Sequence, residues 1–95
     1  MEYGTLYFTA SIAETARADD AFLREIMDAL VRYKLGDWGD LCAEDQQQNE
    51  EALITEARLM GSYVTQRGGK IWIITEAEDD AGSRSVTTVL YPDEY

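Results

Sequence analysis

The side chains that could do chemistry in this chain are almost all carboxylates. Its 95 residues include 19 Asp and Glu, 8 Lys and Arg, one Cys and no His, which gives a formal net charge of −11. Without histidine the chain cannot build a nucleophile activated by a Ser–His or Cys–His pair. One cysteine without histidine also leaves almost no ligands for zinc, haem or an iron–sulfur cluster. Carboxylates remain, and they can catalyse proton transfer, hold a hard metal ion or present negative charge to a partner.

Presenting negative charge to a partner is the use that this pattern favours. Carboxylates recur at helical spacing in the polar segment 41–55, and neighbours on one helix face lie about 5–6 Å apart. The net charge exceeds the magnitude of about 2–8 that suits a small domain. Such a surface is steered to a basic DNA- or RNA-binding groove and is repelled by nucleic acid itself. The carboxylates that we expect to bind such a partner are Asp37, Asp40, Glu44, Glu51, Glu78, Asp79 and Asp80.

Three further roles for the acidic residues stay open. The carboxylates could serve solubility alone. The loop 76–82 resembles a calcium site superficially, but it lacks the spaced aspartates and the distal glutamate of a calcium-binding loop. A pair of carboxylates could catalyse hydrolysis, although nothing marks a pair and a chain of this length has little room for a substrate cleft. We therefore expect no metal ion, no cofactor and no enzymatic activity.

The elements that must position these residues follow from the hydrophobic pattern. β-branched and aromatic side chains dominate residues 3–10, with Leu6 and Phe8 on one face, and predict a strand. Ser11 and Glu14 have the spacing of a capping box, and Asp40 is a suitable N-cap for a polar helix. The expected helices cover residues 12–18, 21–35 and 41–55.

The last third of the chain has a strand pattern. The expected strands cover residues 59–65, 70–76 and 85–91. Arg67-Gly68-Gly69 between the first two predicts a hairpin turn. The chain is thus expected to be one α+β domain over residues 1–95, a small antiparallel sheet of three to four strands packed with two to three helices in the order β-α-α-α-β-β-β. Whether Tyr3–Thr9 joins the sheet is left open.

Apolar residues offer a different way to bind a partner. Trp38 lies between two glycines and is expected in the core, with an exposed anchor as the alternative. Cys42 is expected to be buried as a small apolar residue. Both faces of the strand 70–76 are apolar, so this strand is expected to be central and covered on both sides. If only one side is covered, the face that carries Trp72 could bind a partner or a second copy.

Three segments together resemble a known group of proteins. They are GDWGDLCAED with NEEAL over residues 36–53, KIWIITE at 70–76 and SVTTVLYPDEY at 85–95. The combination is similar to small uncharacterised proteins of plasmids, phages and other mobile elements of bacteria. That family supplies no catalytic residues, and its last two strands are usually joined by a shorter turn than the loop 77–84 here. Small acidic proteins of mobile elements are frequently inhibitors of host defence, of which anti-CRISPR proteins are one class.

The leading expectation is therefore a mobile-element inhibitor of a host nucleic-acid-targeting system. It would act in the bacterial cytoplasm as a monomer or homodimer. As an acidic nucleic-acid mimic it would occlude a basic surface, with a Cas subunit as the expected partner and with neither membrane nor direct nucleic-acid binding. The alternative is a plasmid or phage accessory protein that docks through Trp38 or an apolar sheet face, its acidity serving only solubility.

Overall fold

The computed structural model describes residues 4–55, 57–77 and 86–95. The order of elements confirms the α+β class and the expected succession of strands and helices. The elements are β1 (Thr5–Phe8), α1 (Ala10–Ala18), α2 (Asp20–Lys34), α3 (Ala43–Thr55), β2 (Leu59–Thr65), β3 (Gly69–Thr75), β4 (Val86–Leu90) and a final 3-10 turn, η1 (Pro92–Glu94).

The strands form one sheet in the order β1-β4-β3-β2. β2, β3 and β4 are antiparallel neighbours, as expected, and β3 is an interior strand. The first strand does join the sheet, but it pairs with β4 in parallel, so the sheet is mixed. Nothing local dictates that direction, because β1 and β4 are joined by most of the chain rather than by a hairpin turn.

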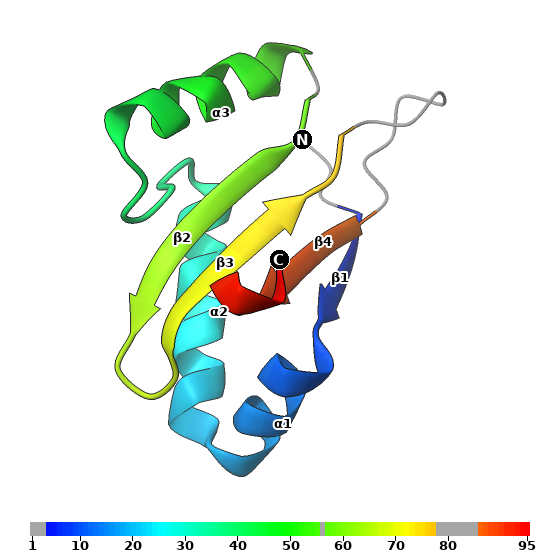
Figure 1. Ribbon diagram of the computed structural model, residues 1–95, viewed down its shortest axis with the longest axis vertical. Helices are drawn as coiled ribbons and strands as arrows, with labels where there is room; N and C mark the ends of the chain where they lie inside the picture. Colours follow the sequence, from blue (N-terminus) through cyan, green and yellow to red (C-terminus); the bar gives the residue numbers. More distant parts are fainter. Residues whose placement is uncertain (1–3, 56, 78–85) are drawn as a thin grey trace.

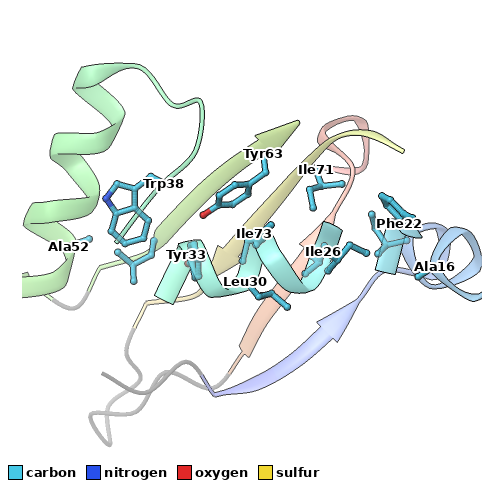
Figure 2. Close-up of a cluster of buried hydrophobic side chains, with 14 residues drawn as sticks. Ala16, Phe22, Ile26, Leu30, Tyr33, Trp38, Ala52, Tyr63, Ile71 and Ile73 are labelled. Carbon is cyan, nitrogen blue, oxygen red and sulfur yellow. The ribbon is translucent and has the colours of Figure 1, made fainter. Parts of the chain in front are cut away.

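One face of the sheet is covered by α2, whose apolar side packs on β2 and β3 (Figure 1). Phe22, Ile26 and Tyr33 from this helix are almost fully buried. Figure 2 shows them in a row that meets Tyr63 of β2 and continues to the other labelled core side chains. This row explains why α2 is the most clearly amphipathic stretch of the sequence. The remaining labelled members are Ala16, Leu30, Trp38, Ala52, Ile71 and Ile73.

The opposite face of the sheet is covered in part by the C-terminal residues. Figure 1 shows η1 and the C-terminus in front of β3 and β4, with α2 behind them. The Tyr95 ring packs edge-on against Trp72, with centroids 5.7 Å apart, and the Arg58 guanidinium lies over the Tyr95 ring. Ile74 on this face is only 5% exposed. The prediction that β3 is central, with both of its faces apolar and covered, is therefore confirmed for the middle of the strand.

Two helix starts differ in part from the expected ones. α1 begins at Ala10, and its cap is the Thr9 hydroxyl, which accepts a hydrogen bond from the Ile12 N–H at 3.4 Å. The capping box predicted from Ser11 and Glu14 was therefore wrong, because the chain leaves β1 and enters the helix two residues earlier. α2 begins at Asp20, one residue before the expected start, and the Asp19 carboxylate caps it by accepting from the backbone N–H groups of the second and third residues of the helix.

Candidate acidic partner-binding surface

The connection between α2 and α3 holds two of the predicted carboxylates. Gly36 and Gly39 both have positive φ values, 83° and 77°, which turn the chain sharply around Asp37 and Trp38. Gly39 also lies directly against the backbone of β2, where an ideal Cβ would come within 1.8 Å of the Ser62 carbonyl oxygen. The connection is therefore seated on the outer edge of β2.

Asp37 is engaged inside the molecule. Its carboxylate accepts from Arg32 Nε at 2.8 Å and from the Gly39 N–H at 3.1 Å. These two hydrogen bonds, with that of Arg32 the larger cause, hold the pKa of Asp37 below its usual value. The side chain thus fixes the turn and is already paired with a cation, so we remove it from the candidate binding set.

Asp40 is also engaged, and it does not lie on the third helix. Its backbone N–H donates to the Ser62 carbonyl at 2.8 Å, which ties it to the edge of β2. The Ser62 hydroxyl first, and then Lys70 at 3.3 Å, lower the pKa of its carboxyl group. The prediction that Asp40 caps this helix was wrong, because α3 begins only at Ala43.

The helix α3 carries the carboxylates that remain available. It has no Lys or Arg, and its four acids are Glu44, Asp45, Glu50 and Glu51. Glu50 accepts a hydrogen bond from the Trp38 indole at 3.2 Å. Glu44, Asp45 and Glu51 are exposed and form no ion pair with any described residue. Asp45 was missed as a candidate, although its place in the first turn of a helix whose charged residues are all acidic could have identified it.

Glu44 and Glu51 share one face of α3. They are seven residues apart, so they lie about 10 Å apart along the axis at a rise of about 1.5 Å per residue. Gln47 lies between them and donates to Glu51 at 3.5 Å. Asp40 precedes α3, so the carboxylates on this face of the helix are Glu44 and Glu51, with the neutral Gln47 between them.

The helix is held to the body by few contacts, which leaves most of it exposed. Only Asn49 and Ala52 are buried. Figure 1 shows α3 beside β2, beyond the margin of the sheet. A helix placed in this way can enter a groove of another molecule without disturbing the core.

Three predicted carboxylates, Glu78, Asp79 and Asp80, lie outside the described residues. Their contribution to an acidic surface stays a prediction from the sequence.

Trp38 and Cys42 differ in burial. Trp38 is 3% exposed and packs edge-on against Tyr33, which confirms the core expectation and removes it as an exposed anchor. Cys42 is exposed, so the prediction that it is buried was wrong. The reason is again the start of α3, because Cys42 precedes the helix instead of lying on its inner face.

Among residues 4–55, 57–77 and 86–95 there is no group of three or more side chains that could hold a metal ion. In the same part of the chain no helix is long and apolar enough to cross a membrane. No family model matches this chain, and no curated protein or solved structure is significantly similar to it.

Proposed function

We propose that this protein is a stoichiometric inhibitor carried by a mobile genetic element, and that it acts by placing α3 in a basic nucleic-acid-binding surface of a host defence complex of the Cas type. The observation that supports this proposal is the composition and placement of α3. Four acids and no base lie on a helix that has only two buried residues. Occlusion of this kind needs no metal ion, no cofactor and no chemical step.

The distance between the carboxylates and the charge of the chain support the same proposal. Glu44 and Glu51 lie about 10 Å apart along the outer face of α3, so one extended basic surface contacts both carboxylates at once. The net charge of −11 adds long-range attraction to a basic partner.

The carboxylates that we propose to contact the partner differ from those expected from the sequence. They are Glu44, Asp45 and Glu51, and Glu78, Asp79 and Asp80 would extend the same acidic surface. Asp37 and Asp40 instead position the connection that leads into α3, since each is paired with a cation of the same molecule.

The alternative of docking through Trp38 loses support because the indole is buried. Docking through the sheet face at Trp72 is also weakened, since Tyr95 lies on that side chain. We therefore keep the electrostatic proposal as the leading one.

The test is capture of partners from a bacterial lysate at low and then at high salt. The double variant Glu44→Lys/Glu51→Lys is compared with Glu14→Lys/Asp28→Lys, which changes the net charge equally on exposed positions of α1 and α2. We expect the wild type and the control to retain a basic nucleic-acid-binding subunit that high salt elutes, and the α3 variant to lose it. Equal retention by both double variants would contradict the proposal.

A further inference from the structure

One flank of α2 is apolar and exposed. Leu23, Met27, Val31 and Leu35 recur every four residues and are 36%, 50%, 58% and 80% exposed. At about 100° per residue the first three fall within a stripe about 80° wide, and this stripe is turned well over 90° from the buried side of the helix. Exposed apolar residues on three successive turns of α2, followed by Leu35 at its C-cap, are unusual in a chain that is otherwise strongly acidic.

The stripe borders a part of the sheet that α2 does not cover. Figure 1 shows α2 passing behind β2 and β3, with β1 at the far edge of the sheet. Between the helix and β1 lies a mainly apolar hollow of about 160 Å³, which Met27, Val31 and Leu6 line together. Leu6 is 44% exposed beside this hollow. The hollow and the stripe therefore form one continuous apolar surface.

The opposite flank of α2 is different. There the Glu25 carboxylate accepts from the Gln66 N–H at 2.8 Å, and Arg32 is paired with Asp37. These polar side chains are engaged with the β2 side of the same molecule. Only the flank that faces β1 is left with apolar side chains and no covering element among the described residues.

The charges on α2 indicate what covers this flank. The helix is neutral, although the whole chain carries −11. Asp20 and Lys34 lie at the two ends of the stripe, each seven residues from Met27, and neither is paired with a described residue. In an antiparallel pair of α2 helices centred on Met27, Asp20 of one copy faces Lys34 of the other, twice. The six charged residues of the helix are Asp20, Arg24, Glu25, Asp28, Arg32 and Lys34.

We propose that this surface binds a second copy of the chain, with the two α2 helices packed antiparallel about a two-fold axis at Met27. Leu23 then contacts Val31 of the other copy. Each α2 helix also covers the β1 side of the other copy's sheet. The axes of the two helices are expected to lie about 8–10 Å apart, as in other packed helix pairs. The dimer buries the exposed apolar stripe of α2 and brings together two neutral surfaces, so the charge of the chain opposes it little.

This proposal is independent of the inhibitor proposal. α3 lies beside β2, at the other margin of the sheet from β1, and stays exposed in the dimer. A monomeric protein that still binds a basic partner would overturn the dimer alone, and a dimer that binds no such partner would overturn the inhibitor alone.

The first experiment is the molar mass in solution, by light scattering and sedimentation over a wide concentration range. We expect the mass to approach twice the chain mass of 10.7 kDa. Met27→Asp should raise the dissociation constant at least about tenfold, since a carboxylate would be desolvated at the centre of the interface. Val64→Asp on β2 is the matched control, because Val64 is also an exposed apolar residue. A wild-type mass of one chain up to the highest soluble concentration would overturn the proposal.

The second experiment exchanges charge and does not depend on a loss of stability. Asp20→Lys and Lys34→Asp should each weaken their own homodimer, because each places like charges opposite one another. Mixed together, the two variants should form a heterodimer in which both facing pairs join a lysine of one chain to an aspartate of the other, and native mass spectrometry detects it. Any folding defect is common to both species, so a heterodimer fraction no higher than random mixing would overturn the antiparallel register.

Discussion

Asn49 of α3 closes the edge of β2 by pairing its side-chain amide with the backbone of Met60. Its Nδ2 donates to the Met60 carbonyl at 2.6 Å, and its Oδ1 accepts from the Met60 N–H at 3.0 Å. The amide thus takes the place of a neighbouring strand at one residue, and the segment 38–40 does the same at Ser62. An edge occupied in this way is protected from pairing with another chain.

Asn49→Ala should therefore destabilise the protein by about 2–3 kcal/mol, since two hydrogen bonds are lost and a partly buried backbone group loses its partners. Urea unfolding measures the change, and Gln48→Ala on the exposed side of α3 is the control, expected within about 0.5 kcal/mol of wild type. The Met60 amide should also exchange with solvent faster in the variant. Unchanged exchange at Met60 would show that the pairing contributes nothing.

The two positive-φ glycines before α3 should respond very differently to alanine. At Gly39 a Cβ would collide with the backbone of Ser62, whereas at Gly36 nothing lies within 4 Å. Gly36→Ala should lower the free energy of unfolding by about 1–2 kcal/mol, because it adds only backbone strain. Gly39→Ala should lower the free energy of unfolding by more than about 3 kcal/mol or displace the segment 38–40 from β2. Thermal unfolding of both variants is the test, and equal losses would mean that the contact with Ser62 is dispensable.

A buried row of hydroxyl groups joins α2 to two strands. Tyr33 donates to Thr75 Oγ1 at 2.7 Å, and Thr75 and Thr87 share a hydrogen bond of 2.8 Å. Tyr33→Phe leaves the ring in place but removes one member of the row, so it should destabilise by about 1–3 kcal/mol. Tyr7→Phe, at a tyrosine that is 53% exposed, serves as the control in urea unfolding. A Tyr33→Phe variant as stable as wild type would argue against an energetic role for the row.

Stability at acid pH should depend on Glu94. Its carboxylate accepts from the Tyr91 N–H at 2.8 Å and from the Thr9 hydroxyl at 2.9 Å, and these contacts, the Tyr91 one first, lower its pKa. A lowered pKa in the folded state stabilises the protein above the unfolded value of about 4.3, and this contribution is lost as the pH falls through the lower, folded pKa.

Glu94→Gln should thus lower the free energy of unfolding by about 0.5–1 kcal/mol near neutral pH and reduce its loss between neutral and acid pH. Urea midpoints measured across this range test the prediction. Asp93→Asn is the control, since Asp93 makes no hydrogen bond or ion pair with a described residue. A parallel pH dependence of the wild type and Glu94→Gln would contradict it.

Local patterns in the sequence predicted the elements well where those elements carry their own periodicity. The apolar side of α2 and the run of β-branched and aromatic residues in β3 are both of this kind. The direction of β1 and the start of α3 were not predictable in the same way, because each is decided by contact with a distant strand. Asp40 shows the reason: it suits a helix cap in isolation, but pairing with Ser62 and Lys70 draws it to the sheet instead.

Contacts between residues far apart in the sequence also limited how well the candidate site could be predicted. The helical spacing of the acids located Glu44 and Glu51, but it could not show that Arg32 and Lys70 would reach Asp37 and Asp40 from elsewhere in the chain. Only tertiary structure separates an available carboxylate from one that is already paired.

The parallel pairing of β1 with β4 also affects the order of events during synthesis. β1 is made well before β4, which is the only described strand with which it pairs. The nascent chain can form α1, α2 and the β2–β3 hairpin, but β1 stays unpaired until β4 has been synthesised. A stalled or truncated chain without residues 86–95 would therefore expose β1 and leave the edge of β3 that pairs with β4 without a neighbour. Exposed strand edges of this kind make such a chain a substrate for chaperones and proteases.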